Sequence, residues 1–297
     1  MKLLIITQKV DQNDPVLGFF HRWLVEIAKH YQQVSVICLG KGQYNLPSNV
    51  KVYSLGKEEG KSVFKYLFRF YKYIWSLRHE YDAVFVHMNQ EYVLLGFKFW
   101  LLLGKPIYLW RNHAKGNFLT RLAVLFSKKV FYTSPASYTA RFQNAVQMPV
   151  GVDGDFFKPD PSTVRPPHSI LLLGRISPVK KVIEFVEWFN GLDESYSATI
   201  AGEALPRDKA YAEQVKALAS GRIKFVGAVD QNEALKLYQT HEIYVNKTPA
   251  GSFDKTIVEA ALTGMKLMVD NPVAQGLNPE DHTLKKLMSR LSQEIKS

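Results

Sequence analysis

Short apolar segments alternate along the chain with longer segments in which apolar residues recur every three or four positions. The short segments are typical of buried parallel strands, and the longer periodic segments are typical of the helices that cover them. In the first half the expected strands are 3–7, 34–39, 50–54, 83–87, 106–110 and 130–133. The expected helices there are 17–30, 63–80, 92–103, 119–127 and 136–142. This alternation predicts a parallel sheet with helices on its faces.

A stretch rich in proline and turn-forming residues interrupts the alternation at 152–167, and this composition favours a linker. Beyond it the expected strands are 169–173, 197–201, 223–226, 243–245 and 266–269. The expected helices are 181–190, 207–218, 231–238, 255–262 and a last one at about 280–295. We therefore predict two Rossmann-like domains, 1–155 and 156–297, and the last helix can pack back on the first. Such domains place a ligand where strand carboxyl ends face each other across a cleft.

Composition is consistent with a protein that has two hydrophobic cores. The chain has 297 residues, of which 46% are hydrophobic. Its single cysteine, Cys38, lies in an apolar strand, so no disulfide framework is possible and a cytoplasmic location fits. The first apolar segment is too short for a signal peptide, and the apolar region 92–103 is too interrupted to span a bilayer.

The net charge of +11 is unevenly distributed. Residues 1–155 contain 20 Lys and Arg against 10 Asp and Glu, whereas residues 156–297 contain 18 against 17. The first half is therefore expected to meet an outside partner that the second half does not meet. Nucleic acid, anionic lipid and an acidic substrate are the candidates, and no recognition motif for a specific nucleic acid is present.

Two cations follow the strand at 169–173. Gly174 and Arg175 come directly after this apolar run, Lys180 follows five residues later, and a helical pattern then begins. Arginine can bind phosphate oxygens in a bidentate manner, and lysine adds a compact charge, so this loop suits a diphosphate. The alternative is a solvated loop with ordinary surface cations.

The segment 251–264 predicts a helix whose first turn offers backbone N–H groups and a positive dipole end near Phe253 and Thr256. Glu259 lies about one turn into this helix, four residues after Lys255. Two interpretations are open. Glu259 either forms a surface ion pair with Lys255 or accepts hydrogen bonds from two ribose hydroxyls.

Two further groups could carry chemistry. His113 follows the strand that ends at Trp110, where it can hydrogen-bond a sugar or a phosphate, although a lone loop histidine is more often incidental. Asp153 and Asp155 have the Asp-x-Asp spacing of a metal pair, but they lie among turn formers, which favours a turn. No His/Cys cluster has metal-ligand spacing, so we expect no metal and no other cofactor.

The predicted helix 63–80 combines a basic face with many aromatic residues. The basic face consists of Lys61, which precedes the helix, and of Lys65, Arg69 and Lys72 within it. The simpler interpretation is a core helix with a basic outer face. The functional interpretation is an interfacial helix that lies on anionic lipid through these four residues.

Five segments in a fixed order resemble the retaining glycosyltransferases of family 4, which have the GT-B fold. These segments are 149–153, 174–180, 200–202, 225–227 and 259–264. The resemblance implies a hexosyltransferase that moves a sugar from a nucleotide-diphosphate donor to an acceptor hydroxyl. The acceptor would be a glycan or a lipid-linked saccharide in cell-surface glycan or glycolipid synthesis, and the enzyme would be cytoplasmic or peripheral on the inner membrane face.

The resemblance also assigns roles to residues. Arg175, Lys180 and His113 would be catalytic: the two cations would hold the donor diphosphate, and the histidine would lie beside the donor sugar or the acceptor. Glu259 would bind the ribose, and Gly18 would let the backbone approach the reacting groups. The full donor-binding set is Gly18, Gly174, Gly251, Ser252, Phe253, Asp254, Lys255, Thr256 and Glu259.

One departure from the family pattern supports a rival function. Gly251 stands where the family has a glutamate that contacts the donor sugar. A non-catalytic protein that binds a nucleotide sugar would tolerate this change. A basic nucleic-acid binder and a sugar-nucleotide epimerase on the same fold are two more rival functions.

Overall fold

The computed structural model describes residues 1–14, 16–250 and 253–297. The chain forms two compact units. Unit 1 contains Met1–Gly151 and Leu284–Ser297, and unit 2 contains Val152–Thr283. The division therefore lies a few residues before the expected boundary at 155, and the last segment of the chain belongs to unit 1.

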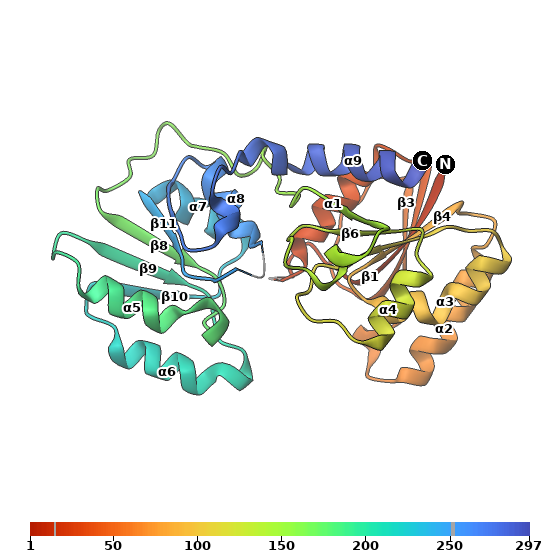
Figure 1. Ribbon diagram of the computed structural model, residues 1–297, viewed down its shortest axis with the longest axis horizontal. Coiled ribbons are helices and arrows are strands. Elements are labelled where there is room, and N and C mark those ends of the chain that lie inside the picture. The colour runs from red at the N-terminus through yellow and green to blue at the C-terminus, as the bar shows by residue number, and fades with distance from the viewer. Residues whose placement is uncertain (15, 251–252) are drawn as a thin grey trace. The chain divides into compact units, whose positions relative to one another are not determined.

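Unit 1 is built on a seven-stranded sheet in the order β3-β2-β1-β4-β5-β6-β7 (Figure 1). Its strands are β1 Lys2–Val10, β2 Gln33–Lys41, β3 Val50–Ser54, β4 Ala83–His87, β5 Ile107–Trp110, β6 Lys129–Tyr132 and β7 Ala145–Gln147. All neighbouring strands run parallel. The expected parallel sheet is confirmed.

Helices cover both faces of this sheet. Successive side chains of a strand point to opposite faces, and in β1 both sets are apolar and need covering. Leu3 and Ile5 of β1 contact the core below α1 (Gly18–Ala28) and α9 (Leu284–Lys296). Leu4 and Ile6 contact the opposite core, below α2, α3 and α4. These three helices are α2 Val63–Ser76, α3 Gln90–Leu102 and α4 Phe118–Leu125.

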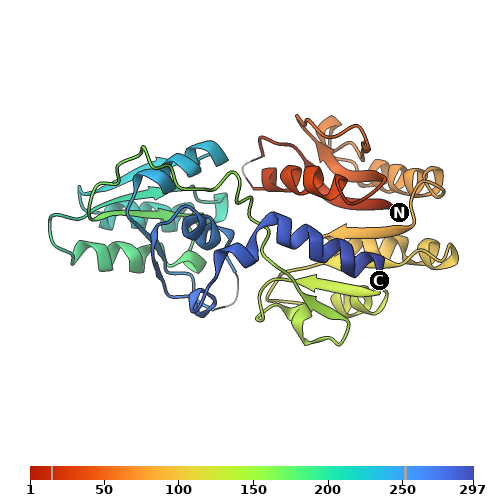
Figure 2. The ribbon, with the colours of Figure 1, turned by 90° about the horizontal axis from the view of Figure 1, so that it is seen from above.

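Helix α9 returns to unit 1 because one of its faces is apolar. Leu284, Leu287, Met288, Leu291 and Ile295 recur at helical spacing and are at most 6% exposed. Figure 2 shows α9 alongside α1, and the two helices are in contact. The hydroxyl of Tyr108 also donates to the Ile295 carbonyl at 2.9 Å. The helix begins at 284, after a short 3₁₀ helix at Pro279–His282, and not at 280.

Unit 2 is built on a five-stranded parallel sheet in the order β10-β9-β8-β11-β12. Its strands are β8 Ser169–Leu173, β9 Ser197–Ala201, β10 Ile223–Gly227, β11 Ile243–Asn246 and β12 Lys266–Val269. Its helices are α5 Val182–Asn190, α6 Lys209–Leu218, α7 Gln231–Thr240 and α8 Lys255–Leu262. Figure 1 shows α5 and α6 on one face of this sheet and α7 and α8 on the other.

The segment expected to be a helix at 136–142 is instead a 3₁₀ helix at Tyr138–Arg141, followed by β7. Two hydroxyls explain the difference. Ser137 and Thr139 donate to the Arg111 carbonyl at 3.3 and 2.7 Å, which ties this segment to the end of β5. Such side-chain bonds to the backbone compete with helix formation.

The proline-rich stretch 152–167 packs on unit 2 and does not behave as a free linker. Phe157 is 3% exposed and contacts the ring of Tyr238 at a centroid distance of 5.9 Å. Arg165 donates to the carbonyls of Tyr238, Gln239, Thr263 and Gly264, at the ends of α7 and α8. These carbonyls have no partner within their helices, so the guanidinium caps both of them.

Within the described ranges, no helix combines the length and the apolar composition that crossing a bilayer requires.

Candidate functional site

Three glycine loops meet at the carboxyl end of the unit 2 sheet. The Gly174 N–H donates to the Ala201 carbonyl at 2.9 Å, and the Gly202 N–H donates to the Gly227 carbonyl at 2.7 Å. At Gly202, where φ is +140°, a Cβ atom would lie 1.9 Å from the Gly174 carbonyl oxygen. Only glycine permits this approach. The loops form a compact backbone platform from which the chain continues into Arg175.

Arg175 leaves this platform with an exposed side chain. Across the part of the chain that the structure describes, its guanidinium has no hydrogen-bond or ion-pair partner. The loop that carries it is nevertheless fixed, because Ile176 is buried and donates its N–H to the Glu203 carbonyl at 3.1 Å. A guanidinium on an ordered loop can bind phosphate oxygens in a bidentate manner.

Lys180 ends the short 3₁₀ helix Pro178–Lys180, and its ammonium forms an ion pair with Asp254. The two side chains are 19% and 12% exposed. The sequence predicts that Lys180 is a cation available to a diphosphate, whereas in the structure it already has a carboxylate partner. An ammonium has three N–H donors, so Lys180 can hold Asp254 and a phosphate oxygen together.

Asp254 collects further donors from the end of β11. Asn246 Nδ2 donates to its carboxylate at 3.2 Å and Thr248 Oγ1 at 3.0 Å. Burial raises the pKa of Asp254, but the Lys180 charge and these hydrogen bonds outweigh it, and the pKa is lowered. The ionised carboxylate therefore ties the loops after β8 and β11 to the start of α8.

Glu259 is oriented by a buried tyrosine. Tyr238, which is fully buried on α7, donates its hydroxyl to Glu259 Oε2 at 2.8 Å. Burial, with the Glu259 charge next, raises the pKa of Tyr238 well above its usual value, so the hydroxyl remains a donor. A carboxylate has four lone-pair sites, and one such bond fixes its direction without using them all.

Lys255 is the first residue of α8 and lies one turn before Glu259. Burial lowers the pKa of Lys255 to about 7, and the Glu259 charge acts in the opposite sense. An electrostatic interaction between Lys255 and Glu259 is therefore present. It coexists with the Tyr238 bond, so Glu259 interacts with both neighbours. A lysine with a pKa near neutrality is a common feature of binding and catalytic sites.

The other residues of this segment differ in what surrounds them. Phe253 is 8% exposed, and its ring meets that of His282 edge-on at 4.9 Å. Thr256 Oγ1 accepts a hydrogen bond from the Tyr244 hydroxyl at 2.7 Å. The predicted donor residues Gly251 and Ser252 lie outside the described residues. The contact from His282 was not anticipated, because it comes from a segment 29 positions beyond Phe253 in the sequence.

His113 and Gly18, the residues of unit 1 predicted to meet the donor or the acceptor, lie at the carboxyl end of its own sheet. His113 is exposed in the loop after β5, and its Nδ1 lies 3.0 Å from the backbone N of Lys115. Gly18 is the first residue of α1. A Cβ atom at Gly18 would lie 3.0 Å from the Gln12 carbonyl, so the close backbone approach at this glycine is to the chain itself.

The same end of unit 1 contains two residues that the sequence did not single out. His87, at the end of β4, is 1% exposed, stacks on Phe20 at 4.0 Å, and lies 3.2 Å from the Thr7 hydroxyl. Met88 follows with φ of +72°, a strained conformation for a long side chain. The signal for His87 was the one used for His113, a histidine at the end of a strand. Nothing in the sequence marks Met88.

Asp153 and Asp155 form a turn. Asp153 Oδ1 accepts the N–H groups of Asp155 and Phe156 at 3.2 and 3.3 Å. Among the residues whose placement is described, no group of three or more His, Cys, Asp or Glu is arranged to hold a metal ion.

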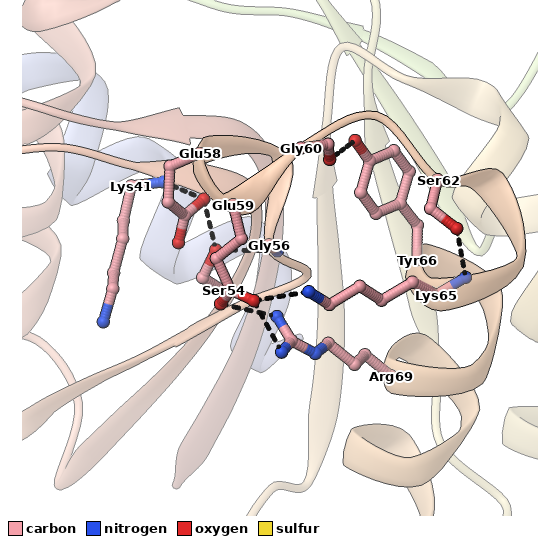
Figure 3. A network of polar contacts seen from close by, with 10 residues as sticks. All are labelled: Lys41, Ser54, Gly56, Glu58, Glu59, Gly60, Ser62, Lys65, Tyr66 and Arg69. Atoms are coloured by element: carbon pink, nitrogen blue, oxygen red, sulfur yellow. Dashed lines mark hydrogen bonds and ion pairs between the residues drawn. The ribbon is translucent and has the colours of Figure 1, made fainter.

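The cations of helix α2 are less available to an outside partner than the sequence indicates (Figure 3). Glu59 precedes the helix and accepts two hydrogen bonds from Arg69, both at 2.9 Å, and one from Lys65 at 2.5 Å. The bonds from Arg69 and Lys65 lower the pKa of Glu59 to about 2. Two of the four predicted lipid-facing cations are therefore already paired within the chain, whereas Lys61 and Lys72 are exposed.

No protein-family profile matches the chain, and no curated protein matches it at a significant level. Solved structures do resemble it. The Anabaena protein Alr3699/HepE in complex with UDP is 19% identical with a TM-score of 0.73, over 100% of this chain and 90% of that one. The lipopolysaccharide outer core galactosyltransferase WaaB is 14% identical with a TM-score of 0.62, over 100% and 90%.

A third similar structure has a different activity. The UDP-GlcNAc 2-epimerase of Methanocaldococcus jannaschii is 13% identical with a TM-score of 0.56, over 100% of this chain and 99% of that one. Together with the two parallel-sheet units, these similarities show that the chain has the GT-B fold. The fold class expected from the sequence is confirmed.

Proposed function

We propose that this protein is a retaining glycosyltransferase that moves a sugar from a UDP-sugar to an acceptor hydroxyl. The observation that carries the proposal is the grouping of Arg175, Lys180 and the start of α8 at the carboxyl end of the unit 2 sheet. The HepE structures with UDP, with UDP and glucose, and with UDP-glucose support a uridine nucleotide as the donor.

In this proposal the donor diphosphate lies between Arg175 and Lys180. Arg175 is exposed and held on a fixed loop, so it can bind two phosphate oxygens at little conformational cost. Lys180 is held in place by Asp254, which positions the ammonium before the donor arrives. The amino end of α8 adds a positive dipole. Glu259, oriented by Tyr238, accepts the ribose hydroxyls.

The reaction breaks the bond between the anomeric carbon and the diphosphate oxygen, and the electron pair remains on the diphosphate. The acceptor oxygen forms a bond to the same face of the anomeric carbon, and its proton passes to a diphosphate oxygen. This route retains the configuration and needs no protein nucleophile. Arg175 and Lys180 stabilise the negative charge that develops on the leaving group, and such electrostatic stabilisation often contributes more to catalysis than any other effect.

The test measures UDP release from UDP-glucose, UDP-galactose and UDP-GlcNAc, with soluble saccharides as acceptors. Arg175→Ala is expected to lower turnover by about 10²- to 10³-fold. Arg207→Ala is the matched control, because Arg207 is an arginine of unit 2 whose side chain is 77% exposed. Equal turnover of both variants would remove Arg175 from the mechanism.

The same assay separates the rival functions. The glycine at 251 favours a protein that only binds the donor. Such a protein would bind UDP saturably but would release no UDP from any UDP-sugar. An epimerase, which the similarity to the UDP-GlcNAc 2-epimerase favours, would convert one UDP-sugar into another without an acceptor.

We place the reaction in the synthesis of a cell-surface glycan or glycolipid at the inner face of the membrane. The similarity to WaaB, a lipopolysaccharide outer core galactosyltransferase, supports this setting. A transfer assay with a soluble saccharide and the same saccharide linked to lipid tests it, and preference for the soluble acceptor would contradict it.

A further inference from the structure

The outer face of α2 carries a continuous row of exposed aromatic side chains. We call it the aromatic stripe and define it as Phe64, Phe68, Tyr71 and Trp75. These side chains are 88%, 71%, 46% and 60% exposed. Their spacing of four, three and four positions places them on one side of the helix. The buried residues of α2, Phe70 and Ile74, face the core instead.

The neighbouring helices extend this apolar surface. The Trp75 ring lies 5.8 Å from the Phe99 ring of α3, so the ends of α2 and α3 are in contact. Leu101 and Leu102, which end α3, are 74% and 86% exposed. Figure 1 shows α2, α3 and α4 side by side on one face of the unit 1 sheet. Large apolar side chains gathered on one surface indicate an interaction site, because exposed apolar residues on soluble proteins are usually scattered singly.

Cations outnumber acidic residues in the region of the chain that contains the aromatic stripe. Residues 61–128, which contain α2, α3 and α4, include eleven Lys and Arg but only three Asp and Glu. Lys61, Lys72 and Lys98 are exposed, and the Arg78 guanidinium lies 4.6 Å from the centre of the Trp75 ring. Exposed aromatic rings with cations beside them are typical of helices that lie at the interface of an anionic bilayer.

We propose that the aromatic stripe inserts into the headgroup layer of an anionic membrane, with Lys61, Lys72, Arg78 and Lys98 beside the lipid phosphates. Apolar burial, and not charge alone, then holds the protein on the membrane, because Glu59 already occupies Lys65 and Arg69. This inference deepens the proposed function and rests on it in one respect: the docked protein would meet a lipid-linked acceptor.

Charge complementarity selects a membrane as the partner. A second copy of this chain would bring the same excess of cations to the contact, and like charges repel. An anionic leaflet supplies phosphates for the cations and an apolar layer for the aromatic rings. A self-association surface is the competing outcome, and sedimentation of the protein alone tests it.

Trp75 provides a direct probe of insertion. It is the most exposed tryptophan, since Trp23, Trp100 and Trp110 are at most 5% exposed and Trp188 is half-buried. Vesicles of phosphatidylcholine with phosphatidylglycerol are expected to shift its fluorescence to shorter wavelength, and brominated lipid should quench it. The variant Trp75→Phe should lose both responses. Unchanged emission on addition of vesicles would overturn insertion.

Flotation with the same vesicles measures the driving force. Phe64→Ser and Phe68→Ser are each expected to lower partitioning about tenfold, from the apolar area that each ring buries. Val164→Ser is the control, because Val164 is 84% exposed on unit 2. High salt should remove only the part of the binding that depends on phosphatidylglycerol. The proposal would be refuted if high salt abolished all vesicle binding or if Val164→Ser lowered binding as much as the stripe variants do. Self-association of the protein through the stripe would refute it as well.

These readouts are independent of turnover. Release of UDP with a soluble acceptor should be the same in Phe64→Ser, Phe68→Ser and the parent protein. If the protein turns over UDP-sugars but does not insert, only the membrane proposal fails. If it inserts but does not turn over UDP-sugars, only the proposed transferase activity fails.

Discussion

Each unit contains cations that were predicted to bind anions and that pair with a carboxylate of the chain. In unit 2 the pairing lies just before α8, and in unit 1 it lies at the start of α2. Lys180 pairs with Asp254, whose side chain is 12% exposed and which also accepts bonds from Asn246 and Thr248. Lys65 and Arg69 pair with Glu59, whose side chain is 45% exposed. The first pair is embedded in a network, and the second is a surface arrangement.

The surroundings of the carboxylate partner determine what it does to the cation. In unit 2 the partner is shielded and held by several hydrogen bonds, so it holds Lys180 in one position and preorganises the site. In unit 1 the partner is solvated, and such pairs contribute little to stability because water and salt screen them. Glu59 therefore lowers the net positive charge at the start of α2, whereas Asp254 fixes the position of the Lys180 charge.

The largest effect should come from breaking the embedded pair. Asp254→Asn leaves the half-buried Lys180 without its counter-charge and weakens the bonds from Asn246 and Thr248. We expect a loss of about 2 kcal/mol in the free energy of unfolding of unit 2, less than for a fully buried pair. Urea denaturation measures it, and UDP affinity should fall as well. A variant as stable as the parent would show that Asp254, like Glu59, forms only a surface pair.

A smaller effect should follow from the pH dependence of Lys255. Because its pKa in the folded protein is lowered to about 7, the ammonium is lost as pH rises through that value. If Lys255 contacts the donor, UDP affinity should fall up to about tenfold between pH 6 and pH 8.5, as expected for the loss of one charged hydrogen bond.

Stability should change in the opposite direction over this range. Between pH 7 and the usual lysine value of 10.5, the unfolded chain binds more protons than the folded chain, so unfolding becomes harder as pH rises. Lys255→Gln should remove both dependences, and calorimetry of UDP binding at several pH values measures the first. An unaltered pH profile in the variant would assign the dependence to another group.

The smallest effect on stability should come from opening the surface pair. Glu59→Gln releases Lys65 and Arg69, so binding to phosphatidylglycerol vesicles should increase about fivefold for each cation that reaches the lipid. The thermal midpoint should hardly change. Glu187→Gln is the control, because Glu187 is exposed on α5 of unit 2. Weaker vesicle binding by Glu59→Gln would mean that Glu59 positions the cations as Asp254 does.

The sequence predicted the elements well where apolar periodicity was strong. Both parallel sheets follow from it, as do the cation-bearing loop at Gly174 and the helix at 255–262. It failed at 136–142, where hydroxyl groups of Ser137 and Thr139 bond to a carbonyl 26 and 28 positions earlier. It also could not place Asp254 on Lys180 or Glu59 on Arg69. Such pairings depend on which loops the fold brings together, and sequence spacing does not encode that.

The residues proposed to meet the donor show the same limit. Arg175 and Glu259 could be named because each follows a pattern local to its own element. Tyr238, which orients Glu259, could not be named, because it is 21 positions away and reads as an ordinary core residue of α7. The residues that position a site are therefore harder to predict than the residues that form it.

The return of α9 to unit 1 makes unit 2 a continuous insertion in the chain of its neighbour. A ribosome finishes all of unit 2 before it delivers the helix that completes the core around Trp23 and Tyr108. Unit 2 can therefore fold cotranslationally as a single piece, whereas unit 1, although synthesised first, becomes complete last. An expression fragment of unit 1 that stops at Gly151 would lack one wall of its core, whereas a fragment of unit 2 from Val152 to Thr283 would lack none of its own.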